Sequence, residues 1–163
     1  MTINEIVDMI DRQKPNAYDL KDKIHWLDQL DRMAWREVIS THEGEPPERK
    51  PIDPDEAQSW QALDMWPPRP PRPEPPEPFE GYKWADDNDL QDGDTVLLIP
   101  DEFRQVYVFW MGAMIDYANQ EMTRYTNSMI MFNTAYADYA NAWNRTHMPL
   151  GARIRGAEGR ILR

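Results

Sequence analysis

The chain has 163 residues, of which 18 are Lys or Arg and 29 are Asp or Glu, so its formal net charge is −11 at pH 7. The absence of Cys excludes a disulfide framework, a thiol nucleophile and a Cys-ligated zinc site. The acidic balance argues against a free nucleic-acid binder, which needs a basic face to displace counterions from phosphates. Because no apolar segment approaches the roughly 18 residues of a membrane span and the N-terminus lacks signal-peptide features, we expect a soluble protein made in the cytoplasm.

The N-terminal part predicts two amphipathic helices joined by a tight turn. Thr2 and Glu5 have the spacing of a capping box, in which each side chain bonds the backbone N–H of the other residue. Apolar residues then recur at helical spacing, and a second helix start follows at Asp19. We expect helices at about 3–13 and about 20–41, which together form an αα-hairpin.

Residues 43–96 form a proline-rich insert. Its centre, residues 67–78, has 8 prolines in 12 residues, which excludes a helix or a central strand and favours an extended polyproline II arm of roughly 37 Å. A short helix is expected before it, over residues 53–64. Pro67 and Pro70 match the general form of a ligand for aromatic-lined grooves, but a stiff spacer or an arm laid on a neighbouring subunit is the favoured interpretation.

A short β-ribbon is expected after the arm. Residues 81–84 and 95–99 are typical of short strands, and Asp92-Gly93 is a turn signal between them. Because a two-stranded ribbon is marginal alone, we expect it to lean on the helices or on a partner.

The helical signal becomes strong after Asp101. Residues 103–118 are apolar nearly all round, which is typical of a helix buried on several sides. Because the domain is small, we expect one side of this helix to pack against other subunits. With three residues of the insert, that side supplies the candidate subunit-interface residues: Val108, Phe109, Met111, Ile115, Pro70, Pro73 and Phe79.

The following segment, residues 122–143, has apolar residues spaced alternately by three and four, as in a heptad seam. This seam is expected to be core or a subunit contact. Asn119-Gln120 is either a kink or the turn between two antiparallel helices, and the second alternative suits a compact core better. His147-Met-Pro149 ends the helix. The predicted fold is therefore mainly α: a small helical bundle made of the N-terminal hairpin and two long C-terminal helices, with a Pro-rich arm and a short β-ribbon.

The last residues, 151–163, form a basic tail. Four Arg stand against one Glu, so the tail carries +3 and leaves −14 on residues 1–150, which we expect to be a single helical domain. Charge asymmetry of this kind indicates that the tail meets an acidic surface.

No motif predicts catalysis or cofactor binding. The three histidines (His25, His42 and His147) have no metal-ligand spacing, and no nucleophile motif or phosphate loop is present. The acidic residues 86–94 fail the EF-hand pattern, since Leu90 and Ile99 would occupy ligand positions; an irregular calcium site is the alternative to a solvated loop. We expect no enzyme, no cofactor and no metal.

Two groups of motifs, one in each half of the chain, carry a family resemblance. The first group is Ile6-x-x-Met-Ile-Asp-x-x-Lys14-Pro-Asn-Ala-Tyr18, Lys23-Ile-x-Trp-Leu-x-x-Leu-Asp31 and Trp35-Arg-Glu-Val-Ile-x-Thr-His42. The second group is Leu97-Leu-Ile-Pro100, Tyr107, Ile115-Asp-Tyr117, Asn127-Ser-Met-x-Met-Phe-Asn133 and Asn144-Arg-Thr-His-Met-Pro149. They resemble short prophage virion proteins from the capsid gene cluster of tailed phages of low-GC Gram-positive bacteria. The Pro-rich insert and the basic tail lie outside the resemblance.

The resemblance implies a head–tail connector, also called an adaptor or head-completion protein. Such proteins are small helical bundles that form a ring, commonly of twelve copies, beneath the portal in the neck of the virion. They extend the DNA ejection channel and present a platform for the next tail or nozzle protein. Their contact with DNA is non-specific passage, and no membrane is involved.

The residues are compatible with this role. A channel that passes DNA without gripping it should be acidic, which fits the net charge. The basic tail is then a candidate anchor on the portal, through Arg153, Ile154, Arg155, Arg160, Ile161, Leu162 and Arg163. The alternatives are another virion protein of the same cluster, for tail completion or head decoration, and an acidic phage inhibitor of a host nucleic-acid enzyme.

Overall fold

The computed structural model describes residues 1–44, 76–82 and 94–150, and this part of the chain is a mainly α bundle, as the sequence predicts. Its α-helices are α1 (Ile3–Gln13), α2 (Leu20–Glu37), α4 (Gln105–Ala118) and α5 (Met122–Thr146). Two 3₁₀ turns, η1 (Ile39–Thr41) and η3 (Asp101–Phe103), extend α2 and precede α4. None of the helices in the described part combines the length and apolar character needed to cross a membrane.

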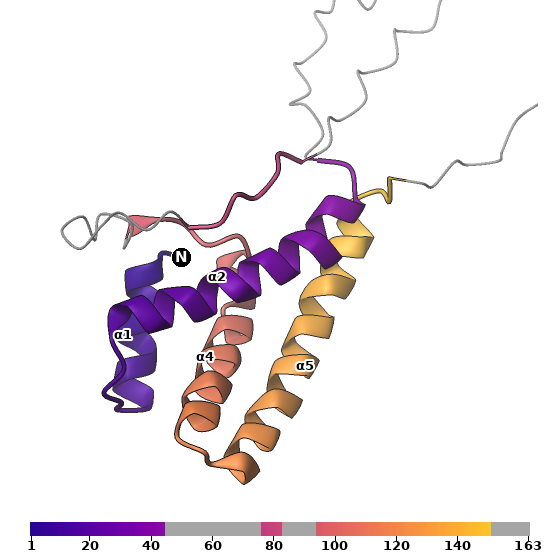
Figure 1. The fold of residues 1–163 in the computed structure, drawn as a ribbon. Coiled ribbons are helices and arrows are strands. Elements are labelled where there is room, and N and C mark those ends of the chain that lie inside the picture. Colours follow the sequence, from indigo (N-terminus) through magenta and orange to yellow (C-terminus); the bar gives the residue numbers. More distant parts are fainter. Residues whose placement is uncertain (45–75, 83–93, 151–163) are drawn as a thin grey trace, which may run out of the picture.

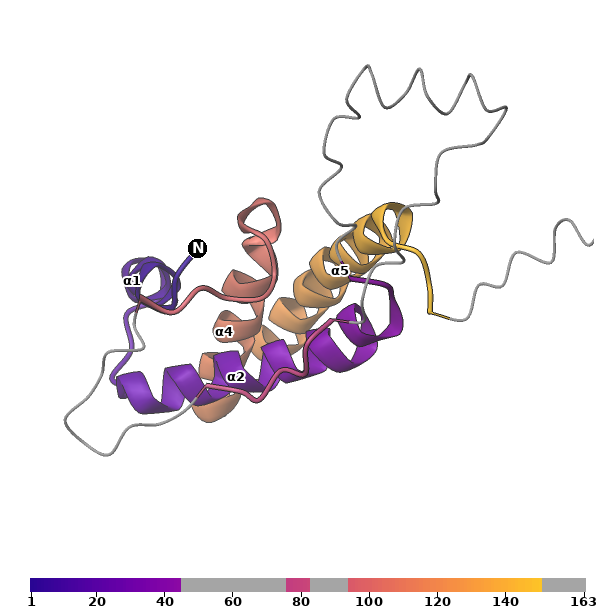
Figure 2. The ribbon, with the colours of Figure 1, turned by 90° about the horizontal axis from the view of Figure 1, so that it is seen from above.

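The helices are arranged as a layer of three with the fourth laid across it. Figures 1 and 2 both show α4 between α1 and α5, with α2 crossing the layer. Helix α4 contacts the other three helices, and α5 packs on it most extensively. The core therefore lies around α4.

The N-terminal hairpin forms as predicted. The Thr2 hydroxyl accepts the Glu5 N–H at 3.3 Å, and the Glu5 carboxylate accepts the Thr2 N–H at 2.8 Å, so the capping box is present. Helix α2 follows Asp19 and buries an apolar face on the rest of the bundle. The helix expected to reach about residue 41 ends as an α-helix at Glu37, and its last turn is the 3₁₀ turn η1. Such 3₁₀ turns are common at the ends of α-helices.

Helix α4 places three of the four candidate interface residues that lie on it inside the core of its own chain. Val108, Met111 and Ile115 are 8%, 0% and 1% exposed and belong to the core of their own chain. Phe109 is half-buried against the same core. The apolar excess of α4 has a simple cause: three helices of one chain surround it, so it is buried on several sides without a second copy.

Helices α4 and α5 are separate, which decides between the two alternatives for this region. Asn119 ends α4, and Gln120 has a φ of 63°, so the chain reverses there. The Glu121 N–H bonds the Asp116 carbonyl at 2.8 Å and closes the turn. The aromatic seam of α5 is core: Phe132 and Tyr139 are buried against the rest of the bundle.

The expected β-ribbon is not formed by the described residues. Val96 pairs instead with Thr2 in an isolated antiparallel bridge, flanked by backbone bonds of 3.1 Å that join residues 1–3 to residues 95–97. Gly81 and Tyr82, from the other expected strand, lie on α2 instead. The expected helix at residues 53–64, the Asp92-Gly93 turn, Pro70, Pro73 and the tail lie outside the described residues.

Two glycines give opposite predictions for stability. Apart from its own stretch of helix, nothing lies within 4 Å of a Cβ built on Gly112 in α4, so Gly112→Ala should stabilise the fold by about 0.5–1 kcal/mol through helix propensity. Gly81 has a φ of 87°, and its Cβ would overlap the Arg32 guanidinium. Gly81→Ala should therefore cost more than about 1 kcal/mol. Urea denaturation measures both changes, and equal effects would contradict these placements.

Candidate functional site

Asp31 is the centre of a buried hydrogen-bond network. Its side chain on α2 is fully buried and accepts the Tyr82 hydroxyl, the Tyr107 hydroxyl at 2.5 Å and the Leu98 N–H at 3.2 Å. Burial raises the pKa of Asp31, although the three donors favour its charged form. Burial and the Asp31 charge raise the pKa of Tyr82 and Tyr107, so both hydroxyls stay protonated donors. The network joins α2, α4 and two non-helical segments.

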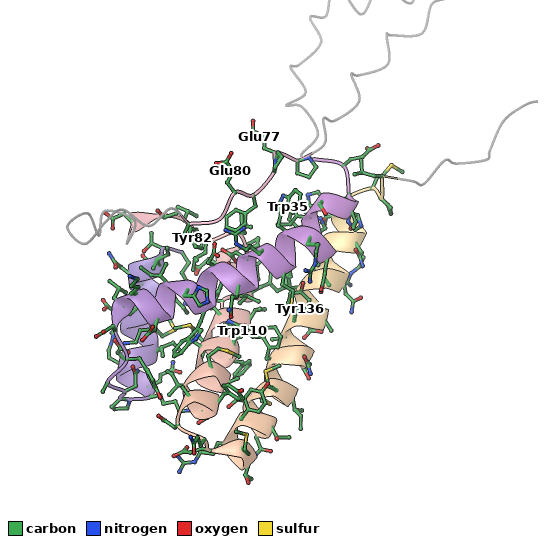
Figure 3. All side chains as sticks on the ribbon, viewed as in Figure 1. Trp35, Glu77, Glu80, Tyr82, Trp110 and Tyr136 are labelled. Carbon is green, nitrogen blue, oxygen red and sulfur yellow. The ribbon has the colours of Figure 1, made fainter. Side chains whose placement is uncertain are left out.

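Residues 76–82 are held on α2 largely through their backbone. The Trp35 indole N–H donates to the Glu77 carbonyl at 3.1 Å, and Arg32 donates to the Glu80 carbonyl at 3.0 Å. The Tyr82 N–H donates to the Asp28 carboxylate at 2.9 Å. Figure 3 shows this segment along α2, with its Glu77 near Trp35 at one end of the contact and its Tyr82 toward the other end.

A second polar cluster lies at the other end of α4. Asp116 is 1% exposed, and its carboxylate accepts the Lys14 ammonium and, at 2.9 Å, the Ser128 hydroxyl. Lys14 also donates to the Gly112 carbonyl at 3.1 Å. This cluster ties the end of α1 to α4 and α5.

Each cluster pairs a buried carboxylate with hydroxyl, amide or ammonium donors. Among the described residues, no group of three or more His, Asp or Glu is placed to hold a metal. His42 is buried, with Nδ1 2.8 Å from the Val38 carbonyl at the end of α2. His147 stacks on Trp143 with ring centroids 3.8 Å apart. The Asp31 and Asp116 clusters join different helices of the bundle.

The feature that requires a functional explanation is the outer face of α5. Of the 25 residues of this helix, Phe132 and Tyr139 are the buried ones. Between Arg124 and Arg145, Asp138 is its only charged residue. We use "outer face" for exposed residues on the side opposite the core: Thr123, Asn127, Ile130, Met131, Thr134, Ala137, Asp138 and Asn141.

The exposed side of α2 gives the contrast. It carries the charges usual on a helix in water: Lys21, Asp22, Arg32, Arg36 and Glu37. The outer face of α5 instead exposes Ile130 and Met131 by 58% and 51%. Other large exposed apolar residues are Tyr117 at the end of α4, Met122 at the start of α5, and Met148 and Leu150 after its end. The exposed pair Ile130 and Met131 in the middle of α5 is a candidate contact point for an interaction surface.

The candidate residues from the sequence are only partly brought together. Val108, Met111 and Ile115 lie in the core, and Phe79 packs edge-on against Tyr82 of its own chain. Pro70, Pro73 and the seven tail residues from Arg153 to Arg163 are outside the described residues. The outer face of α5 was missed, although one sequence signal was available: a 25-residue helix with three charged residues in a chain that is 29% charged.

The chain was compared with known proteins at three levels. No protein-family model, no curated protein and no solved structure matches it. The geometry and the residues therefore carry the functional argument.

The Asp31 network predicts different effects for two buried tyrosines. Tyr107→Phe removes a donor to Asp31 and the acceptor of the Ile99 N–H, so it should cost about 1–3 kcal/mol. Tyr139→Phe should leave stability unchanged or raise it, because the Tyr139 hydroxyl is buried without a hydrogen-bond partner among the described residues. Thermal and urea unfolding compare the pair. An equal loss in both variants would contradict the network.

The shifted pKa values of Asp31 and Asp11 predict opposite pH dependences of the free energy of unfolding. The raised pKa of Asp31 means that its contribution to stability is present at low pH and is lost as pH rises through its folded pKa. For Asp11, burial alone would raise the pKa, but bonds from Lys23 and Asn16 outweigh burial and lower it. Its contribution is present above its ordinary pKa and lost as pH falls through the folded value.

The measurement is the unfolding free energy against pH for the wild type, Asp31→Asn and Asp11→Asn. With rising pH, the wild type should lose stability relative to Asp31→Asn and gain stability relative to Asp11→Asn. Parallel curves for either variant would refute the corresponding shift.

Proposed function

We propose that this protein is a structural virion protein: a head–tail connector that forms a ring beneath the portal of a tailed phage, extends the DNA channel and receives the next tail component. The proposal starts from the resemblance of residues 1–42 and 97–149 to short prophage virion proteins. The observation that carries the proposal further is the way in which the resembling motifs meet in the fold.

Motif residues from the two halves of the chain bind one another. Lys14 pairs with Asp116, which also accepts from Ser128. Asp31 accepts from Tyr107. The quoted motifs therefore belong to one packed bundle in this chain, which is compatible with the small helical bundle that the resemblance implies.

Charge and surface also support a structural role. Residues 1–150 carry −14, which suits a channel wall that must not retain DNA. The buried Asp31 and Asp116 join segments of the bundle. The exposed Ile130 and Met131 on α5 are compatible with a protein that assembles with others.

The test is to mix the chain with particles carrying its cognate portal protein and to image them by electron cryo-microscopy. We expect a ring of density stacked on the portal. Density elsewhere on the particle would move the assignment to decoration or tail completion. Absence from particles, together with tight one-to-one binding to a host nuclease or polymerase, would favour the acidic inhibitor.

The basic tail provides a separate prediction within this experiment. Removing residues 151–163 should abolish portal attachment, because the tail carries +3 beside a body of −14. The melting temperature should be unchanged, since the described bundle ends before the tail. Replacing the four tail Arg by Gln is the matched variant that keeps the length. Attachment at wild-type level in both variants would overturn the anchor.

A further inference from the structure

Residues 76–82 lie along α2 and are held there by four side chains of that one helix (Figure 3). The four are Asp28, Asp31, Arg32 and Trp35. The last three follow Asp28 by three, four and seven residues, so all four share one face of the helix. We call these four side chains the ladder of α2.

Three members of the ladder bind the backbone of the segment. The carbonyls of Glu77 and Glu80 accept from the indole N–H and the guanidinium, at 3.1 Å and 3.0 Å. The Tyr82 N–H donates to the Asp28 carboxylate at 2.9 Å. Hydrogen bonds to the main chain are the part of peptide recognition that supplies affinity without reading side chains.

The same face restricts two positions of the segment. Gly81 has a φ of 87°, and a Cβ built on it would overlap the Arg32 guanidinium, so this position requires Gly. Tyr82 is 8% exposed, and its hydroxyl donates to Asp31, so Phe at this position would leave the buried carboxylate with one donor fewer. Phe79 packs edge-on against the Tyr82 ring, with centroids 5.4 Å apart. The ladder therefore selects an aromatic residue, any residue, Gly and Tyr, in that order.

The segment covers α2 from outside the helical packing. Of residues 76–82, Tyr82 is the buried one, and Glu77, Pro78 and Glu80 are exposed. Helix α2 contacts α1 and α4 directly, so the helices hold one another without the segment. A segment with one buried side chain and much exposed surface belongs to the parts of a protein that open locally at low cost.

We propose that the ladder of α2 is a peptide-binding site for an aromatic-x-Gly-Tyr segment, and that residues 76–82 are its ligand, bound reversibly within the chain. Release of the segment opens the site while the helices stay packed, and a free peptide of the same pattern competes for it. The site goes beyond the proposed function and does not depend on it, since every contact that defines it lies within one chain.

The first experiment uses the full chain with Tyr82→Ala, which empties the buried end of the site. The probe is a synthetic peptide of residues 76–82 with blocked ends. It is titrated to about 5 mM while amide chemical shifts are followed by NMR, because a tethered segment acts at an effective concentration in the millimolar range. We expect saturable one-to-one binding and a higher melting temperature of the variant with peptide. The wild type should bind the peptide at least about tenfold more weakly, because its own segment competes.

Altered peptides and a matched pair of chain variants test the specificity. Peptides with Gly81→Ala or Tyr82→Phe should each bind at least about tenfold more weakly, and a scrambled peptide of the same composition should not bind. In the Tyr82→Ala chain, a further Arg32→Gln should weaken binding. Arg36→Gln is the control, because it makes the same change one turn further along α2, where Arg36 pairs with Glu37. This control should bind the peptide as before.

Hydrogen exchange of the wild type is a test that needs no variant. The Tyr82 N–H should exchange through local opening at least about tenfold more often than the Met111 N–H in the middle of α4. Equal exchange at both positions would overturn the proposal. So would a Tyr82→Ala chain that melts cooperatively and does not bind the peptide at the same concentrations, or altered peptides that bind as well as the natural one.

Discussion

The buried carboxylate of Asp31 is the constraint on which the arrangement of the non-helical segments depends. A carboxylate removed from water must find donors, and the three that it finds come from Tyr82, Leu98 and Tyr107. These belong to the segment on α2, to the segment before α4 and to α4 itself. One side chain therefore sets where both segments cross the bundle.

Helix α4 is fixed at both ends by such polar contacts. Tyr107 in its first turns bonds Asp31, and Asp116 in its last turn receives Lys14 and Ser128. Apolar packing alone is non-directional and would leave the rotation of a helix that is apolar nearly all round poorly specified. The two clusters supply that direction. Because α4 lies at the centre of the bundle, its apolar surface is covered by other helices of the same chain.

Because the apolar surface of α4 is covered within one chain, the candidate surface for assembly lies on α5, where Ile130 and Met131 are exposed. Helix α5 has an aromatic seam in the core, and its exposed side carries Thr, Asn, Ala, Ile and Met with one acid, Asp138, where the exposed side of α2 carries five charged residues. This difference between α2 and α5 is one observation behind the proposed role in assembly.

The sequence by itself determined the local structure. Capping at Thr2 and Glu5, helical spacing, and the stop at His147-Met-Pro149 depend on near neighbours, so the helices and the mainly α class could be predicted. The tertiary structure decided which faces are free. Val108, Met111 and Ile115 are candidates for an interface from the sequence but lie in the core, because spacing shows that a helix is apolar but not how many neighbours surround it. Among the described residues of the expected ribbon, Val96 pairs with Thr2 and Tyr82 bonds Asp31, because pairing across a long chain separation depends on the packed core and not on local propensity.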